Sequence, residues 1–348
     1  METTSKTQEK ATLRYLEGLN DHVLIFDGAM GTSIQRYQLT ADDFGGEKLN
    51  GCNDYLVITR PDVIEAIHAS FLAVGSEVIE TNTFRSNRIT LAEYGLQDRV
   101  IEINRAAAQL ARRVADRYGA ETGRARFVAG SIGPSGKLPS SDDPDMSNVG
   151  FDELSKVFYE QAQGLVEGGA DVLLVETSQD ILEVKAAVNG ITRYFADSGK
   201  RVALQAQVTL DVSGRMLLGT DIAAALATLE ALPIDVIGLN CSTGPEHMRE
   251  PIRYLTEHAT KPISVLPNAG LPINVDGEAV YPMEPEPFAK MLAEFAEWGV
   301  SVVGGCCGTT PDHLARVIEK VGPARPQKVR EPETEPHASS GMRATALI

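Results

Sequence analysis

The 348 residues of this chain are 43% hydrophobic and 23% charged, which is typical of a globular protein with a sizeable core. The 32 Lys and Arg residues against 48 Asp and Glu residues give a net charge of −16, which argues against general nucleic-acid binding, since a phosphate backbone requires a basic surface. No apolar run approaches the roughly 20 residues of a membrane span, and residues 1–10 lack the apolar centre of a secretory signal. We therefore expect a cytoplasmic protein that binds neither membranes nor nucleic acid.

Short apolar runs alternate with longer amphipathic stretches, a pattern typical of βα units around a parallel sheet. Leu13, Leu16 and Leu19 predict a short leading helix. Eight runs then predict strands, at residues 23–26, 78–80, 126–129, 172–175, 202–205, 236–239, 263–266 and 300–303. The stretches between them predict helices, at residues 60–73, 98–118, 152–167, 180–195, 221–231, 246–257 and 286–298. Three predicted helices end on a glycine just before a strand, at Gly75, Gly169 and Gly299.

Eight parallel strands with intervening helices in about 300 residues fit a single (β/α)8 TIM barrel, which is an α/β fold. The barrel would span residues 1–322, with the leading helix over its floor and residues 133–150 as an extended loop. A doubly wound open sheet is the alternative, because it differs by a miscount of one or two strands. Residues 323–348 carry four prolines among charged and small residues and are predicted to be a Pro-rich linker or tail, as would join a further domain.

Three of the four cysteines follow two of the predicted strands. Cys241 comes directly after the sixth strand, and Cys306 and Cys307 come after the eighth, flanked by glycines. Catalytic groups of a barrel lie where strands end, so we expect all three on one face. Thr310 followed by Pro311 predicts a helix that begins just beyond the pair, and the positive end of that helix favours thiolates.

Three thiolates with one open position suit Zn²⁺, which prefers sulfur and tetrahedral geometry, and an open position is typical of a catalytic site. In the alternative interpretation Cys241 is an ordinary buried thiol, while Cys306 and Cys307 form a vicinal disulfide. The spacing alone leaves both open, because no CxxC pairs are present. Cys52 has no partner in this scheme and is expected to be structural.

Six segments resemble a known family, at residues 27–32 (DGAMGT), 51–54 (GCND), 80–84 (ETNTF), 238–241 (GLNC), 267–272 (PNAGLP) and 304–311 (GGCCGTTP). They look like the zinc-dependent homocysteine S-methyltransferases, and most of all like the N-terminal homocysteine-binding domain of cobalamin-dependent methionine synthases. The resemblance covers about residues 24 to 321, and its double-cysteine motif with an upstream single cysteine is highly specific.

The resemblance implies a (β/α)8 barrel in which Cys241, Cys306 and Cys307 bind zinc at the C-terminal ends of the strands. It also implies that Asn268 can be the fourth ligand when substrate is absent, although Asn268 could equally be a turn residue. Homocysteine would enter the open position and become a thiolate, because coordination to Zn²⁺ deprotonates a thiol whose free pKa is about 8.5. We therefore expect no catalytic residue beyond the zinc-activated substrate thiol.

The rest of homocysteine needs an ammonium partner and a cradle for its carboxylate. Glu176, at the end of the fourth strand, resembles the amino-group acceptor of the family. Asp27 ends the first strand, and the backbone N–H groups that follow it, including those of Gly28 and Ala29, suit an anion. The alternative for this segment is a plain strand-to-helix turn.

Four other residues have weaker signals. Asn82, after the second strand, is a candidate for the pocket wall. Glu80 is either a second pocket acid or, as we favour, a barrel-interior residue with a partner. His68 and Trp298 lie in amphipathic helical stretches and are expected to be packing residues.

Family members differ mainly in methyl donor. The PNAGLP and GGCCGTTP motifs look most like those of the methionine synthase type, which uses methylcobalamin. None of the six histidines follows an Asp two residues earlier, so the chain lacks the cobalt-ligating motif of that enzyme. The corrinoid would therefore be carried, like folate, by a partner domain or protein. The alternatives are a stand-alone methyltransferase that uses betaine or S-methylmethionine and, in another functional class, a non-catalytic zinc or thiol sensor.

Overall fold

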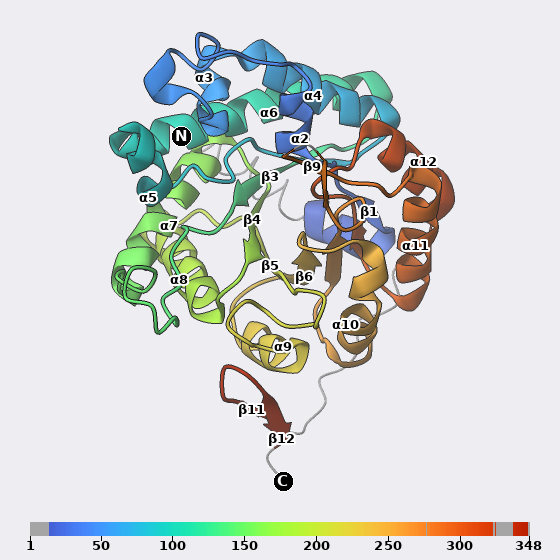
Figure 1. The fold of residues 1–348 in the computed structure, drawn as a ribbon. Coiled ribbons are helices and arrows are strands. Elements are labelled where there is room, and N and C mark those ends of the chain that lie inside the picture. The colour runs from blue at the N-terminus through green and yellow to red at the C-terminus, as the bar shows by residue number, and fades with distance from the viewer. Residues whose placement is uncertain (1–13, 276, 323, 325–336, 347–348) are drawn as a thin grey trace.

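The computed structural model describes residues 14–275, 277–322, 324 and 337–346 (Figure 1). Its main sheet has eight parallel strands: β1 (Leu24–Ile25), β2 (Val78–Glu80), β3 (Phe127–Ile132), β4 (Val172–Ser178), β5 (Ala203–Val208), β6 (Val236–Asn240), β7 (Ile263–Leu266) and β10 (Val302–Val303). Their order is β1-β10-β7-β6-β5-β4-β3-β2, and a parallel bridge between Phe26 and Val78 joins the two ends. The sheet therefore closes, which confirms the predicted TIM barrel and excludes the doubly wound alternative.

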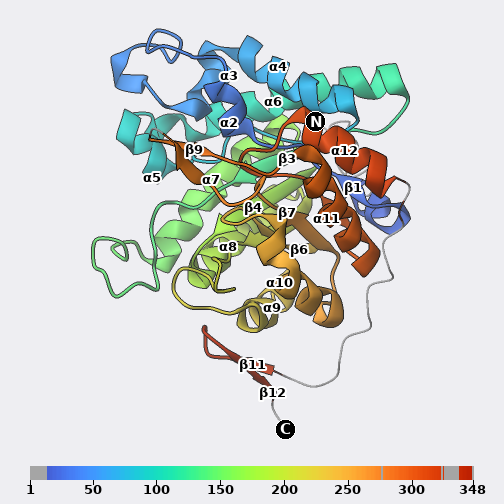
Figure 2. The same cartoon turned by 45° about the vertical axis from the view of Figure 1, so that its right-hand side comes forward.

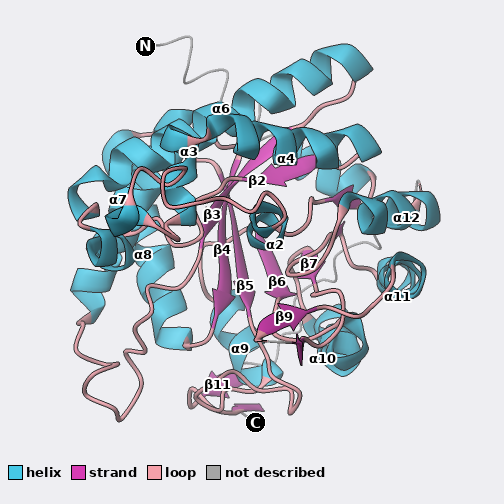
Figure 3. Ribbon diagram, turned by 45° about the horizontal axis from the view of Figure 1, so that its top comes forward, coloured by secondary structure: helices cyan, strands magenta, loops and turns pink. Residues whose placement is uncertain are grey.

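Helices surround the strands on the outside of the barrel (Figure 3). The longer helices are α4 (Pro61–Val74), α6 (Val100–Thr122), α7 (Phe151–Gly168), α8 (Ile181–Ser198), α9 (Ile222–Glu230), α10 (Pro245–His258), α11 (Pro285–Trp298) and α12 (Pro311–Val321). Short helical segments lie between β1 and α6, at α2 (Met30–Gln35), η1 (Glu47–Leu49), η2 (Asn53–Tyr55), α3 (Leu56–Thr59), α5 (Arg88–Leu91), η3 (Ala92–Tyr94) and η4 (Gln97–Arg99). All seven predicted helices are confirmed within a few residues at each end.

Local chemistry explains several of these boundaries. Gly75, Gly169 and Gly299 each follow a helix with φ between 103° and 113°, a conformation that glycine adopts without a steric penalty. Thr310 caps α12: its Oγ1 accepts from the N–H of His313, while His313 Nδ1 accepts from the N–H of Thr310. The predicted start of this helix, directly after the cysteine pair, is therefore confirmed.

The leading helix covers the barrel floor, as predicted. Residues 14–21 are helical, and Leu13 lies outside the described residues. Tyr15 and Leu19 are buried against interior side chains of the strands, including Phe127, whose ring meets that of Tyr15 edge to face. The hydroxyl of Tyr15 donates to Gln205 Oε1 inside the barrel (2.9 Å). This end of the barrel is thus filled, which leaves the opposite end, where the strands finish, for a site.

Two hairpins were not predicted. The first, β8 (Ile273–Val275) with β9 (Glu278–Val280), follows β7, and its side chains are exposed. The second, β11 (His337–Ser339) with β12 (Ala344–Ala346), lies beside α9 (Figures 1 and 2). Its Met342 carbonyl accepts from the N–H of Asp221 (3.1 Å). Residues 325–336 of the predicted linker lie outside the described residues, so the domain boundary at 322 stays a prediction. In the described part of the chain, the helices are too short or too polar to cross a bilayer.

Candidate metal centre and substrate pocket

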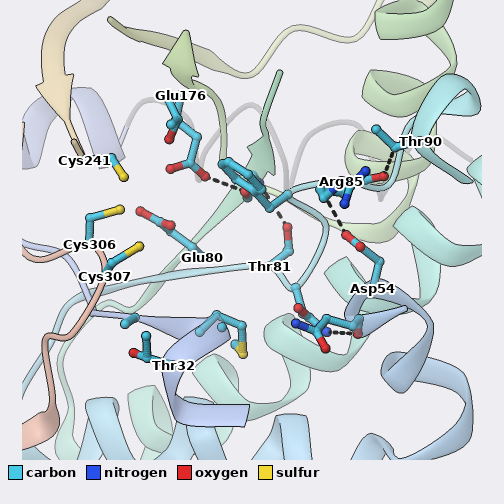
Figure 4. A pocket seen from close by; sticks show the side chains of 18 of the residues that line it. Thr32, Asp54, Glu80, Thr81, Arg85, Thr90, Glu176, Cys241, Cys306 and Cys307 are labelled. Atoms are coloured by element: carbon cyan, nitrogen blue, oxygen red, sulfur yellow. Dashed lines mark hydrogen bonds between the residues drawn. The ribbon is translucent and has the colours of Figure 1, made fainter. Parts of the chain in front are cut away.

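A pocket of about 290 Å³ opens at the C-terminal ends of the strands (Figure 4). Its walls come from the loops that follow β1, β2, β4, β6 and β10, and the three clustered cysteines, Glu80 and Glu176 all line it. Small-molecule sites typically occupy about 300–1,000 Å³, so the pocket suits a ligand of amino-acid size.

The three predicted cysteines meet at one wall of this pocket. The sulfur atoms of Cys241, Cys306 and Cys307 all lie within 4.8 Å of one another (Figure 4). In a tetrahedral zinc site with Zn–S bonds of 2.3 Å, neighbouring sulfurs are about 3.8 Å apart. Among the described residues this is the only group of three His, Cys, Asp or Glu side chains close enough to share an ion. The donor set and its spacing therefore fit Zn²⁺.

The last residue of β7 and the loop after it hold all three cysteines in place. The backbone carbonyls of residues 266 and 267 accept from the N–H groups of Cys241 (3.1 Å) and Cys306 (2.8 Å). Asn268 Oδ1 accepts from the N–H of Cys307 (3.0 Å). Since β7 lies between β6 and β10 in the sheet, one loop ties the two cysteine-bearing loops together.

The backbone around the cysteines adopts conformations that few sequences allow. Cys241 and Ser242 have φ values of 60° and 61°, in the left-handed region that non-glycine residues rarely occupy. Gly308 has φ 78°, and a Cβ there would lie 2.2 Å from Cβ of Tyr281. A Cβ at Gly305 would lie 2.3 Å from Thr309 Oγ1. The glycines on both sides of the cysteine pair are therefore needed for this close approach.

The thiols interact strongly with one another in the absence of a metal. Hydrogen bonds from Cys241 and Cys306 lower the pKa of Cys307 to about 3. The hydrogen bond to Cys241 raises the pKa of Cys306 well above its ordinary value. Three thiols this close together, one of them with a lowered pKa, form a donor set suited to a cation.

Two buried acids, Asp27 and Glu176, and the half-buried Glu80 face the same region. Burial raises the pKa of each, to about 7 for Glu176. Ser131 Oγ donates to Glu176 Oε1, and the N–H of Glu80 donates to Asp27 (3.0 Å), whose Oδ1 is buried without a partner among the residues that the structure describes. An ammonium group entering here would find carboxylates that lack a cation, since the described residues place no Lys or Arg side chain against them.

The other predicted pocket residues fit this arrangement to different degrees. Gly28 and Ala29 line the pocket, but the N–H of Ala29 already donates to the hydroxyl (3.1 Å) and carbonyl (3.3 Å) of Thr309. Asn82 also lines it, and its Nδ2 donates to the carbonyl of Asn53 (2.7 Å). Asn268 Oδ1 is occupied by the Cys307 N–H, so a role as fourth ligand stays a prediction.

Glu80 differs from the interpretation favoured from sequence. It lines the pocket, and its carboxylate receives no hydrogen bond within the described ranges (Figure 4). This fits the alternative, a second pocket acid.

Cys52, His68 and Trp298 lie outside the cysteine cluster. Cys52 is buried at another part of the pocket, where burial raises its pKa to about 12. His68 is fully buried in α4, and the ring of Trp298 packs at a tilt against that of Phe295, with 5.3 Å between ring centroids. Packing roles fit all three.

Sequence reasoning assigned no role to two residues at the site. Asp54 lines the pocket and accepts from the N–H of Arg85 (3.0 Å), and burial raises its pKa to about 6. Asn240, the last residue of β6, lies behind the pocket wall and bonds to Glu176 (3.1 Å). Both belong to the motifs that carry the family resemblance, GCND and GLNC, so their position in those motifs was the available signal.

Residues 24–321 match the homocysteine S-methyltransferase family. The chain belongs to this family. It is a methyltransferase domain, and the predicted family membership is confirmed. It is 43% identical over 345 residues to methionine synthase of Mycobacterium leprae, and 45% identical over 327 residues to that of Mycobacterium tuberculosis. These alignments cover 98% and 93% of this chain but only 28% and 27% of the relatives, so the methyltransferase domain spans under a third of their length.

The fold of this methyltransferase is also found in solved structures. The homocysteine methyltransferase MmuM from Escherichia coli, in oxidized and metallated forms, superposes with a TM-score of 0.69 at 22% identity. The match covers 85% of this chain and 95% of MmuM. It supports the barrel independently of the strand pattern.

Proposed function

We propose that this homocysteine S-methyltransferase domain binds Zn²⁺ through Cys241, Cys306 and Cys307 and is the homocysteine-activating module of a methionine synthase, with methylcobalamin as methyl donor. The observation that carries the metal assignment is the convergence of three sulfurs within 4.8 Å at the pocket wall. The two relatives named methionine synthase, at 43% and 45% identity, support the assignment of the reaction.

The bound zinc would supply a deprotonated substrate thiol at neutral pH, since coordination lowers the pKa of a thiol far below about 8.5. Three cysteinates leave the site net negative, so the substrate sulfur would keep the electron density needed to attack a methyl group. The chain itself needs no general base for this step. Its contribution is a ligand set whose backbone is held by hydrogen bonds to residues 266–268.

The protein would hold the amino-acid part of homocysteine at the opposite side of the same pocket. Glu176 would accept the ammonium group, with Asp27 and Glu80 adding negative charge nearby. The N–H of Gly28 and the first turn after it would receive the substrate carboxylate, while the N–H of Ala29 stays bonded to Thr309. Asn82 would form part of the wall and Asn268 the fourth ligand when substrate is absent.

The methyl donor would reach the thiol from outside the barrel. The chain carries no Asp-x-His motif for a corrinoid, and it covers 28% of the methionine synthase of Mycobacterium leprae. We therefore assign methylcobalamin and folate to partner domains or proteins. The C-terminal barrel face, where the pocket opens, is where a corrinoid carrier would dock.

A methyl-transfer assay on the zinc-loaded protein tests the proposal. Homocysteine is supplied with methylcobalamin, betaine or S-methylmethionine, and methionine is measured. Methionine from methylcobalamin alone supports the methionine synthase assignment. Turnover with betaine or S-methylmethionine would instead make the chain a stand-alone methyltransferase, and zinc binding without any turnover would favour a sensor.

The ligand assignment has its own test. Cys307→Ala is expected to lose zinc, measured by mass spectrometry of the metal, and to lose activity, with an unchanged circular dichroism spectrum. Cys52→Ala, which removes the thiol outside the cluster, should retain its zinc. Full zinc and activity in Cys307→Ala would contradict the assignment.

A further inference from the structure

Asn240 uses its whole side-chain amide to hold one short segment of β4. Its Oδ1 accepts from the N–H of Thr177 (2.7 Å). Its Nδ2 donates to Thr177 Oγ1 (2.8 Å) and to Glu176 Oε2 (3.1 Å). The residue is fully buried, so these bonds do not compete with solvent.

The segment that Asn240 holds departs from regular strand geometry. The register of β4 against β5 shifts between Val175 and Ser178. Within this shift, Thr177 has φ 55°, which is unfavourable for a β-branched residue and requires support from its surroundings. β-Bulges next to sites commonly redirect a side chain. Here the side chain concerned is that of Glu176, which points toward the cysteines (Figure 4).

Asn240 is also joined to the cysteine cluster. It directly precedes Cys241 in the chain, and its Nδ2 lies 3.9 Å from Cys306 Sγ. Its own carbonyl accepts from Thr209 Oγ1 (2.7 Å), which fixes the end of β6 against the end of β5. One side chain thus connects the proposed metal loop with the proposed ammonium acceptor.

We propose that Asn240 is a positioning residue for substrate recognition, which holds the Glu176 carboxylate at the place where the amino group of homocysteine binds. This inference rests on the proposed function, in which Glu176 receives that amino group. Asn240 is not itself a proposed ligand of the metal or of the substrate, and its contact with Cys306 Sγ (3.9 Å) is longer than its bonds to Thr177 and Glu176. Its loss should therefore weaken the recognition of the amino group and leave the metal and the thiol contact in place.

A comparison of two ligands isolates this effect. Homocysteine and 4-mercaptobutanoate share the thiol and the carboxylate, and only homocysteine has the amino group. Their affinities for zinc-loaded wild type, Asn240→Ala and Asn240→Asp are measured by calorimetry, with the zinc content of each sample. Asn240→Asp keeps nearly the same shape and an acceptor for the Thr177 N–H, but places a carboxylate oxygen against Glu176.

Gln207 offers a matched control. It is a second fully buried carboxamide, on the neighbouring β5, paired with Gly238 two residues before Asn240. Within the part of the chain that the structure describes, neither its Nε2 nor its Oε1 has a hydrogen-bond partner. Gln207→Leu therefore removes a buried amide close to the site without removing a bond to Glu176.

Both Asn240 variants are expected to bind homocysteine about 10- to 100-fold more weakly, the effect of losing a hydrogen bond to a charged group. Their affinity for 4-mercaptobutanoate should change by less than about threefold, within the range of context effects on single interactions. Gln207→Leu should keep the wild-type preference for homocysteine.

The other outcomes are distinct. A wild type that does not prefer homocysteine over 4-mercaptobutanoate would remove the proposed role of Glu176. A wild type with this preference and Asn240 variants that retain it would overturn the role of Asn240 alone. Loss of zinc from both Asn240 variants would also overturn it, because Asn240 would then support the metal loop rather than Glu176.

Discussion

Glu183 provides a test of the electrostatics at the edge of the barrel's C-terminal face. It lies in the first turn of α8, and its side chain is 2% exposed. Its Oε1 accepts from both the N–H (2.9 Å) and the hydroxyl of Ser135, which anchors the long loop after β3. Its Oε2 is buried and has no hydrogen-bond partner among the described residues. Burial, only partly offset by the bonds from Ser135, raises the pKa of Glu183 from 4.5 to about 7.

The sign of the effect on stability follows from proton binding. Between pH 4.5 and pH 7 the folded protein keeps the proton on Glu183, while the unfolded chain releases it. The folded state therefore binds more protons, and the free energy of unfolding falls as pH rises through this window. With about 1.4 kcal/mol per pKa unit, this group alone lowers the free energy of unfolding by roughly 2–3 kcal/mol between pH 5 and pH 8.

Glu183→Gln removes this dependence and keeps an acceptor for Ser135. The free energy of unfolding of the variant minus that of wild type should be roughly 2–3 kcal/mol larger at pH 8 than at pH 5. Both free energies are obtained from urea denaturation of the two proteins at the two pH values. The other buried acids are the same in both proteins, so their contributions cancel. Glu153→Gln, at an exposed position in the first turn of α7, controls for the loss of one negative charge at a helix N-terminus. An equal difference between Glu183→Gln and wild type at pH 5 and pH 8 would refute the reasoning.

Two glycines give further predictions. Gly190 lies where α8 meets α7, and a Cβ there would be 2.1 Å from the carbonyl oxygen of Ser155. Gly190→Ala should therefore lower the free energy of unfolding, measured in urea, by at least about 1–3 kcal/mol. An unchanged midpoint would contradict this packing. Gly308→Ala should displace the cysteine loop, because Gly308 has a left-handed φ and no space beside Tyr281. The affinity for zinc, measured by competition with a chelator, should fall at least tenfold, which is within the range for changes to the surroundings of a metal site. Gly31→Ala serves as the control, because a Cβ there meets no described atom within 4 Å.

The sequence was sufficient to predict the eight strands because each contains a short apolar run between helical patterns. It predicted the ends of three strands less well. β3, β4 and β5 continue to Ile132, Ser178 and Val208, past the predicted ends at residues 129, 175 and 205. At these strand ends the barrel interior is polar because it forms the pocket floor, so a strand defined by apolar residues appears to end too early. For the same reason, the predicted sixth strand stops one residue before Asn240, the polar last residue of β6.

The two hairpins were missed because neither carries a buried apolar run. The side chains of β8 and β9 are exposed. A signal was available for this hairpin, since Ile273, Asn274 and Val275 alternate before the Asp-Gly pair of residues 276 and 277, which is typical of a tight hairpin turn. Runs long and apolar enough to form barrel strands were therefore recognised, and short surface strands were not.

The cysteine cluster could be predicted only in part. The strand ends place Cys241, Cys306 and Cys307 on one face, and this part follows from fold topology. Their distances do not, because they depend on residues 266–268, at the end of β7 and in the loop after it, which supply one acceptor to each cysteine. Since these bonds are made by the backbone and by Asn268, they remain when a cysteine side chain is shortened. Removal of the metal or of one thiol should therefore empty the site while the loops and the barrel beneath them stay in place.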